Sequence, residues 1–241
     1  MIQINKVSKS YKKDNNVINE ISLTINDGEI FGFLGPNGAG KTTTIKMITG
    51  ILGIDKGDIY IDGKSITKDS IEAKKRFSYV PDNPDMFLKL KGIEYLNFIA
   101  DIYEINTKDR IDRINRLSKE FEMQDVLKNK IQSYSHGMRQ KIVIIGALLH
   151  EPQNLILDEP MTGLDPKASY DLKNIMREYT KNNKTVFFST HILEVAEKLC
   201  DRLAIINKGD IIFVGTYEDM KKEFRKNASL EELFMEITEN D

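Results

Sequence analysis

A glycine-rich segment, GPNGAGKTT at residues 35–43, has the composition and spacing of a phosphate-binding loop. A glycine, four residues and then Gly-Lys-Thr suit this role because glycines let successive backbone N–H groups turn toward phosphate oxygens. Lys41 can then reach the β- and γ-phosphates, and the Thr42 hydroxyl can bind Mg²⁺. The residues predicted to hold the nucleotide are those of the loop: Gly35, Pro36, Asn37, Gly38, Ala39, Gly40, Lys41, Thr42 and Thr43.

The segments on both sides of this loop fit the same interpretation. Residues 30–34 are apolar and predict a buried strand, and residues 43–49 predict a helix that ends near Gly50. This order places the loop at a helix N-terminus, where the helix dipole favours anions. The alternative, a glycine-rich turn with a lysine by chance, is disfavoured by the flanking elements.

A second apolar strand, residues 154–157, leads directly into two carboxylates, Asp158 and Glu159. Phosphate-loop enzymes present a metal-binding Asp at such a strand end, so Asp158 is predicted to hold Mg²⁺ together with Thr42. Glu159 can orient or deprotonate the attacking water. On its own this pattern is often only a solvated strand end, but its combination with the phosphate loop favours catalysis.

Three shorter signals add candidate site residues. Ser135 predicts the N-cap of the apolar helix that follows, and with Gly137 it predicts a helix N-terminus suited to an anion. His191 ends the predicted strand segment at residues 187–191, and beside the other motifs we expect it to contact a γ-phosphate rather than serve only the fold. Tyr11 either stacks on a purine ring or is an ordinary core or surface aromatic.

Composition and periodicity indicate an α/β protein of 241 residues with net charge −2 and a single cysteine. Neither a nucleic-acid nor an anionic-membrane partner is indicated by this charge, and no apolar run reaches the roughly 20 residues of a membrane span. We therefore expect a soluble intracellular protein. Strand patterns at residues 2–7, 17–25, 57–63 and 77–80 precede a helical region, and strands return from residue 154. These patterns predict an α/β core, residues 1–83 and 151–241, with an inserted helical subdomain at 84–150.

Taken together, the motifs resemble the ATP-binding subunit of an ABC transporter over nearly the whole chain. In order, they match the adenine-stacking tyrosine (Tyr11), Walker A (35–43), the strand into the Q-loop (79–82), the signature (134–138), Walker B with its glutamate (155–159), the D-loop (163–166) and the switch histidine (His191).

The resemblance implies a P-loop NTPase core with an N-terminal antiparallel β subdomain and an inserted α-helical subdomain, forming one cassette over residues 1–241. It implies ATP hydrolysis with Mg²⁺, with Lys41, Glu159 and His191 as catalytic residues. Two such subunits pair head to tail, with each ATP between one Walker A and the signature of the other subunit, where Ser135 and Gly137 lie. The resemblance further implies a membrane permease as partner and a cytoplasmic location, peripheral on the inner face of the cell membrane. Since one chain carries every catalytic residue, a homodimer is favoured, and no nucleic acid is expected.

Two positions depart from the family pattern. Asp82 stands where the family usually has glutamine, and its charge could bind Mg²⁺ or hold the water differently; alternatively it caps the turn into Asn83-Pro84. His136 replaces the first glycine of the usual Leu-Ser-Gly-Gly-Gln signature, while Ser135 and Gly137 retain the helix-end donors.

The segment at residues 229–238 is similar to the ending of ABC ATPases that serve drug, peptide or antibiotic exporters, which predicts export of an unidentified substrate. An amphipathic helix packed on its own domain is compatible with this interpretation. Two other protein classes are alternatives. Asn-Lys-Gly-Asp at 207–210 matches the guanine-reading pattern of GTPases, but a turn between two strands is favoured. A soluble ABC ATPase without a transporter, such as an iron–sulfur assembly ATPase, is the second alternative.

Overall fold

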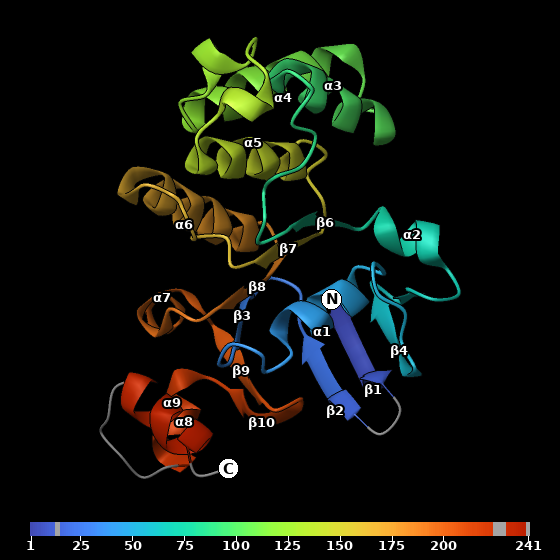
Figure 1. Ribbon diagram of the computed structural model, residues 1–241, viewed down its shortest axis with the longest axis vertical. Coiled ribbons are helices and arrows are strands. Elements are labelled where there is room, and N and C mark those ends of the chain that lie inside the picture. The colour runs from blue at the N-terminus through green and yellow to red at the C-terminus, as the bar shows by residue number, and fades with distance from the viewer. Residues whose placement is uncertain (13–14, 224–229, 240–241) are drawn as a thin grey trace.

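The computed structural model describes residues 1–12, 15–223 and 230–239, and Figure 1 shows their arrangement. The strands are β1 (Ile2–Lys12), β2 (Asn15–Ile25), β3 (Ile30–Leu34), β4 (Lys56–Ile61), β5 (Lys64–Ser65), β6 (Phe77–Val80), β7 (Asn154–Asp158), β8 (Thr185–Thr190), β9 (Arg202–Asn207) and β10 (Asp210–Gly215). The helices are α1 (Lys41–Ile48), α2 (Ser70–Lys74), α3 (Gly92–Ile102), α4 (Thr107–Glu120), α5 (His136–Leu148), α6 (Pro166–Lys181), α7 (Leu193–Leu199), α8 (Tyr217–Glu223) and α9 (Leu230–Glu239).

A six-stranded sheet, ordered β10-β9-β3-β8-β7-β6, forms the centre of the molecule, and only the β9–β10 pair is antiparallel. Every residue of β3, β7 and β8 is buried, as expected of parallel strands that are covered on both faces. Because these strands run in the same direction, their carboxyl ends lie along one edge of the sheet. Leu34 pairs with Thr190 there, and Asp158 pairs with Ser189.

A second sheet, ordered β2-β1-β4-β5, is antiparallel and confirms the predicted N-terminal β subdomain. One apolar cluster joins this sheet to α1 and to one face of the central sheet, with Ile45 of α1 packed among residues such as Ile4 and Phe187. β1 and β2 are each 11 residues long, so β1 extends well beyond the predicted segment at residues 2–7. Its register shifts after Ile4, which interrupts the alternation of apolar and polar side chains.

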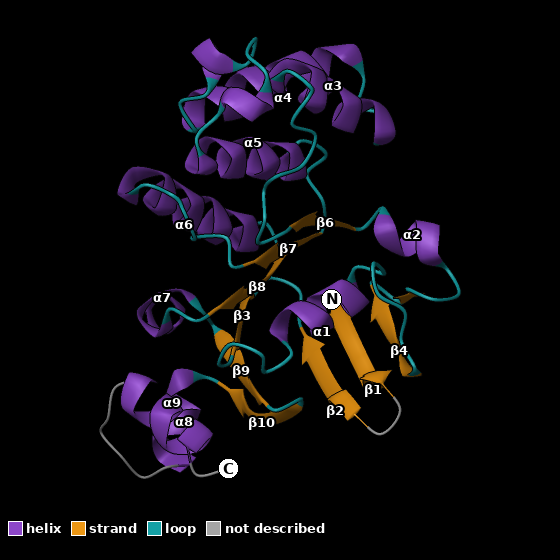
Figure 2. Cartoon of the chain, viewed as in Figure 1, coloured by secondary structure: helices purple, strands orange, loops and turns teal. Residues whose placement is uncertain are grey.

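Helices α3, α4 and α5 form the upper part of the molecule, where Figure 2 shows no strand. Their apolar side chains share one cluster with the other face of the central sheet, which includes Leu96 of α3, Leu117 of α4, Ile144 of α5 and Leu157 of β7. The helical region is therefore packed directly on the core. The proposed division at residues 83/84 and 150/151 stays a prediction.

The last described segment confirms an amphipathic helix, α9, whose Leu230 belongs to a small apolar cluster with Leu203 of β9 and Met220 of α8. Phe234 packs against this cluster. Ser229, the first residue of the predicted tail segment, lies outside the described residues. Among the helices that the structure describes, none has both the length and the apolar composition needed to cross a membrane.

Candidate active site

The phosphate loop joins the carboxyl end of β3 to the start of α1, as predicted. Gly40, the N-cap of α1, has a φ of 113°, which a residue with a side chain rarely adopts. Gly35 packs so closely on the neighbouring strand that an added Cβ would lie 2.4 Å from the carbonyl oxygen of Ile206. The sequence therefore needs glycine at both positions, and the loop leads from the carboxyl end of β3 directly into the N-terminus of α1.

The Lys41 side chain is buried and folds back over the phosphate loop. Its Nζ donates hydrogen bonds to the carbonyl oxygens of Gly35 (2.7 Å) and Pro36 (3.3 Å) and lies 3.9 Å from Oε1 of Glu159. Burial lowers the pKa of Lys41, and the negative charges of Glu159 and Asp158 counteract this shift. The ammonium group thus lies where phosphate oxygens could replace the two carbonyl oxygens.

Asp158, the last residue of β7, is fully buried with only half of its carboxylate bonded. Oδ1 accepts a hydrogen bond from the Ser189 hydroxyl (2.5 Å), whereas Oδ2 has no partner among the described residues. Burial raises the pKa of Asp158, and the charges of Asp82 and Glu159 raise it further. The Ser189 hydroxyl, which is hydrogen-bonded to Oδ1, opposes the shift, and so does the nearby Thr42 hydroxyl, which makes no hydrogen bond to the carboxylate. A buried anion with a free oxygen is costly unless a cation or donor completes it.

The oxygen atoms of Asp158 and Thr42 are suitable ligands for Mg²⁺. This ion prefers oxygen ligands and is commonly held by one or two carboxylates together with substrate phosphates. Asp158 Oδ2 and the Thr42 hydroxyl supply such oxygens beside the phosphate loop. Within the described part of the chain, no group of three or more His, Cys, Asp and Glu side chains gathers into a metal site, so phosphate oxygens would have to complete the coordination.

Glu159 lies within reach of the other two predicted catalytic residues, Lys41 and His191. His191 Nδ1 lies 2.9 Å from Glu159 Oε2, on the side of the carboxylate away from Lys41. The backbone of Glu159 has a φ of 48°, an uncommon value for glutamate, and its N–H donates to Ser189 Oγ (3.0 Å). The structure therefore brings Lys41, Glu159 and His191 together from three separate elements, with a strained backbone at the central residue.

Asp82 combines features of both predicted alternatives. It follows β6 in an exposed turn, and its Oδ1 accepts a hydrogen bond from the backbone N–H of Asn83 (2.8 Å), as a turn residue would. Its charge nevertheless acts on the buried carboxylate of Asp158. The turn also contacts α5, because Asp85 pairs with Arg139 at 2.7 Å.

The remaining predicted residues are Ser135 and Gly137, at the start of α5, and Tyr11, in β1. Ser135 is the N-cap of α5, as predicted, and its Oγ accepts a hydrogen bond from the N–H of Met138 (3.3 Å). In the described part of the chain, no hydrogen bond or ion pair joins Ser135 or Gly137 to the phosphate loop. Tyr11 is 59% exposed near the end of β1. A nucleotide site that includes Ser135 and Gly137 together with the phosphate loop requires surfaces that this single chain does not bring together.

Ser189 was not predicted as a site residue, although it touches both members of the Asp158–Glu159 pair. Its hydroxyl donates to Asp158 and accepts from the N–H of Glu159. The only feature of the sequence that points to this role is the position of Ser189 near the carboxyl end of a predicted strand. Recognising its role requires the pairing of Asp158 with Ser189, which depends on β7 and β8 being neighbours.

The Asn-Lys-Gly-Asp sequence forms the turn between β9 and β10, so the turn interpretation is confirmed. The Asp210 carboxylate accepts a hydrogen bond from Asn19 Nδ2 (2.8 Å), which ties this turn to β2. The turn thus has a structural role in joining the two sheets.

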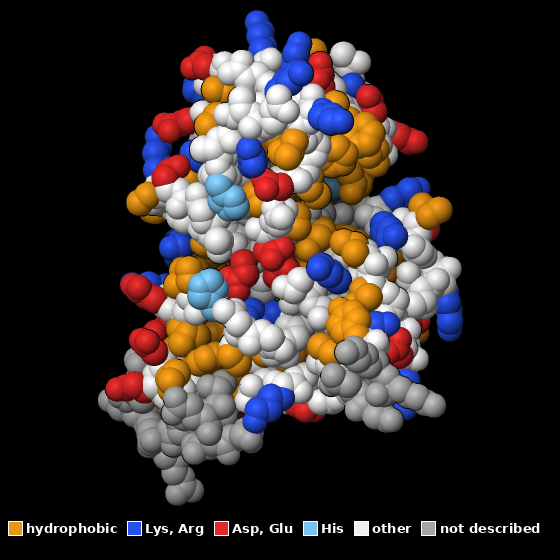
Figure 3. All heavy atoms as spheres, in the orientation of Figure 1, with side chains coloured by type: hydrophobic (Ala, Val, Ile, Leu, Met, Phe, Trp, Pro, Cys, Tyr) orange, Lys and Arg blue, Asp and Glu red, His pale blue; other side chains and the backbone are white. Residues whose placement is uncertain are grey.

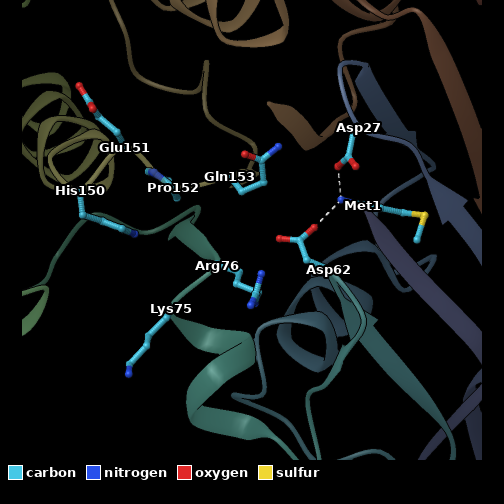
Figure 4. A pocket seen from close by; sticks show the side chains of 9 residues that line it. All are labelled: Met1, Asp27, Asp62, Lys75, Arg76, His150, Glu151, Pro152 and Gln153. Carbon is cyan, nitrogen blue, oxygen red and sulfur yellow. Dashed lines mark hydrogen bonds and ion pairs between the residues drawn. The ribbon is translucent and has the colours of Figure 1, made fainter. Parts of the chain in front are cut away.

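A separate cavity of about 520 Å³ lies near the amino ends of the parallel strands (Figure 4). Met1, Asp27, Asp62, Lys75, Arg76, His150, Glu151, Pro152 and Gln153 line it. None of the predicted site residues belongs to this set. The candidate active site is therefore confined to the opposite edge of the sheet.

Comparisons with known proteins show which family the chain resembles. A family model described as "ABC transporter" matches residues 18–162. The chain is 36% identical to the ABC-type transporter ATP-binding protein EcsA of Bacillus subtilis, covering 100% of this chain and 98% of that one. It is 35% identical to the linearmycin resistance ATP-binding protein LnrL of Bacillus subtilis, covering 91% and 70%. A solved structure of the ATP binding subunit of an ABC transporter is 33% identical, with a TM-score of 0.94 over 98% of this chain and 99% of that one.

Proposed function

Because the chain belongs to the family of ABC transporter ATP-binding proteins and is thus an ATP-hydrolysing subunit, we propose that the phosphate loop and the carboxyl ends of β7 and β8 form its hydrolysis site. The observation that carries this assignment is the convergence of Lys41, Glu159 and His191. ATP hydrolysis by this subunit powers the transport of an unidentified substrate through a separate membrane protein.

Each residue has a distinct role in this proposal. Lys41 exchanges its bonds to Gly35 and Pro36 for bonds to the β- and γ-phosphates, which neutralises charge as the terminal phosphate departs. Glu159 orients the attacking water and accepts its proton. His191 holds the Glu159 carboxylate and faces the γ-phosphate, while the N–H groups of the loop bind phosphate oxygens.

Mg²⁺ is part of the proposed site, with Asp158 and Thr42 as its protein ligands and Asp82 as a nearby charge. When bound, the ion neutralises negative charge on the β- and γ-phosphates. Before it binds, Ser189 stabilises the buried carboxylate of Asp158 through its hydroxyl group.

A dimer completes the site in this proposal. Ser135 and Gly137 lie at the N-terminus of α5, an environment that favours phosphate, yet among the described residues no hydrogen bond or ion pair joins them to the phosphate loop of their own chain. We place them against ATP held by a second copy of the chain, with Tyr11 of the first copy stacking on its own adenine. The two copies then close around two ATP molecules.

The Glu159→Gln variant tests the dimer because it keeps the shape of the side chain but removes the base. Turnover should fall by about 10²–10⁴-fold, so ATP stays bound and the dimer persists. Size-exclusion chromatography should show a dimer with ATP and Mg²⁺ and a monomer with ADP. A variant that remains monomeric with saturating ATP contradicts the shared site.

A set of exposed hydrophobic side chains is a candidate binding surface for the membrane partner. Phe87, Phe98 and Ile102 are 44, 43 and 56% exposed, and the Phe87 ring lies 5.7 Å from Phe98. Figure 3 shows hydrophobic side chains gathered on the upper part of this face, beside α3. Exposed apolar clusters of this kind commonly bind other proteins, and this one begins five residues after Asp82. We assign it to a membrane permease, which places the chain in the cytoplasm on the inner face of the membrane.

Export is the proposed direction of transport. LnrL carries linearmycin resistance in its name, and removal of a toxic compound from the cell is one route to resistance. The amphipathic α9 also agrees with the exporter-like tail.

The Lys41→Ala variant tests the site assignment directly. Lys46→Ala is a matched control, since Lys46 lies in the same helix beyond the site. We expect Lys41→Ala to lower ATP turnover by at least about 10³-fold with an unchanged melting temperature, and EDTA to abolish turnover of the unmodified protein. Near-normal turnover of Lys41→Ala, or equal effects of both variants, rejects the assignment. Purification from native membranes then identifies the permease.

A further inference from the structure

The signature segment and the loop that follows Glu159 interlock within one chain. Gly163 has a φ of 77°, and a Cβ added there would lie 2.2 Å from Cδ2 and 2.7 Å from Nε2 of His136. A Cβ added to Gly137 would lie 2.7 Å from the carbonyl oxygen of Gly163. The imidazole ring of His136 therefore fills the space where a side chain at Gly163 would lie.

A second contact fixes the far end of the same loop. Lys141 Nζ lies 2.8 Å from Asp165 Oδ2, little more than one helical turn along α5 from His136. Asp165 is also the N-cap of α6, because its Oδ1 accepts a hydrogen bond from the N–H of Ala168 (2.9 Å). Residues 163–165 are thus attached to α5 at two points.

The attached loop leads back to Glu159 in four residues. The N–H of Thr162 donates to the carbonyl oxygen of Glu159 (3.1 Å), and the N–H of Leu164 donates to that of Met161 (3.3 Å). Two successive hydrogen-bonded turns therefore join Gly163 to Glu159, and both residues have positive φ. A shift at Gly163 would rotate this short segment and move the Glu159 carboxylate relative to Lys41 and His191.

We propose that His136 is a positioning residue for ATP hydrolysis: its ring packs on Gly163 and thereby holds the loop that orients Glu159. The glycine that the family usually has at this position could not make this contact. His136 acts through the loop and not on the reacting atoms. This inference rests on the proposed function, since it assigns Glu159 the catalytic role.

Two variants at His136 separate ring packing from other roles. His136→Ala removes the ring and keeps a good helix former, whereas His136→Phe keeps a flat ring and removes the imidazole nitrogens. His136 is exposed, so both variants should fold, and melting curves check this. With His136→Ala we expect kcat to fall by about 10-fold with little change in KM for ATP, because misplacing a catalytic group slows the chemical step. His136→Phe should restore kcat to within about twofold of the unmodified protein.

Hydrogen exchange of the isolated protein without nucleotide provides a readout independent of turnover. The amides of Thr162 and Leu164 should exchange faster in His136→Ala and at the original rate in His136→Phe. Unchanged exchange in His136→Ala overturns the proposal, and so does faster exchange with an intact kcat. Equal losses of kcat in both variants also overturn it, because they assign the effect to the imidazole nitrogens. Turnover of the unmodified protein no higher than that of Lys41→Ala rejects the proposed function instead, while the exchange rates still decide the contact.

Discussion

The two ends of β7 carry two buried polar side chains, Asn154 and Asp158, whose surroundings differ. Both are fully buried. Nδ2 of Asn154 donates to Asp62 Oδ2 (3.0 Å) and to the carbonyl oxygen of Arg76 (3.1 Å), and its Oδ1 accepts from the Met1 ammonium group (3.3 Å). Every hydrogen-bonding atom of this amide is thus satisfied by the protein itself.

At the carboxyl end, Asp158 has a bonded oxygen and an oxygen with no partner in the described residues. The hydrogen-bond network is therefore complete at the amino end of β7, around Asn154, and incomplete at the carboxyl end, around Asp158. A buried polar atom without a partner lowers stability, so its retention is best explained by a ligand that completes it. Along β7, therefore, the unmet bonding requirement of Asp158, and not burial, distinguishes it from Asn154.

The largest effect should come from Asp158→Asn, which removes the charge and keeps the shape. We expect ATP turnover to fall by about 10²–10³-fold, since a group that stabilises the reacting charges is lost. The free energy of unfolding without nucleotide should be at least as high as that of the unmodified protein, because a buried charge with a raised pKa is removed. Turnover assays and urea unfolding test both parts. A variant that is less stable and still active would remove the contrast between the two ends of β7.

The free energy of unfolding should depend on pH through His150, a half-buried side chain near the amino end of β7. Burial, aided by the charges of Lys184 and Arg113, lowers the pKa of His150 from 6.5 to about 4. The unfolded chain therefore binds this proton more readily than the folded protein between those values, so stability is present above pH 6.5 and is lost as the pH falls toward 4. The loss should approach about 3 kcal/mol in the free energy of unfolding.

His150→Phe is the control for this prediction. The imidazole of His150 stacks on Tyr103, with ring centroids 3.4 Å apart, and phenylalanine can retain that packing. Urea unfolding at several pH values should show a smaller acid loss in the variant than in the unmodified protein. Parallel curves for the two proteins would exclude His150 as the source.

Sequence reasoning located those parts of the site that depend on short segments. The phosphate loop and the Asp158–Glu159 pair follow from a strand, a turn and a helix start, whose signals lie within a few residues of each other. The role of Ser189 depends on the order of strands in the sheet, which tertiary packing decides. The network around Asn154 joins residues separated by up to 153 positions, so no local pattern predicts it.

A smaller effect is expected from Asn154→Ala, which breaks the completed network. Removing the amide leaves the Arg76 carbonyl oxygen without its side-chain donor and loosens Met1 and Asp62. We expect a loss of about 1–3 kcal/mol in the free energy of unfolding, because a buried side chain loses three hydrogen bonds that are each worth about 0.5–1.5 kcal/mol net. Turnover of the folded protein should change by less than about twofold, since the site lies at the opposite sheet edge. A selective loss of turnover without a loss of stability would contradict the structural role of Asn154.

The smallest effect is predicted for Asp82→Gln, which gives the chain the residue that the family usually has. If the charge of Asp82 helps the carboxyl end of β7 to attract Mg²⁺, the variant should need a higher Mg²⁺ concentration for half-maximal turnover. An exposed charge contributes at most about 1 kcal/mol, so the midpoint should rise by no more than about fivefold.

Asp85→Asn is the matched control, because it removes one negative charge three residues away, where the carboxylate pairs with Arg139. Turnover measured against Mg²⁺, beside a melting curve, distinguishes the two interpretations of Asp82. An unmoved midpoint with a lower melting temperature would leave only the hydrogen bond from the N–H of Asn83, and Asp82 would then be a turn residue that serves the fold, as Asn154 does.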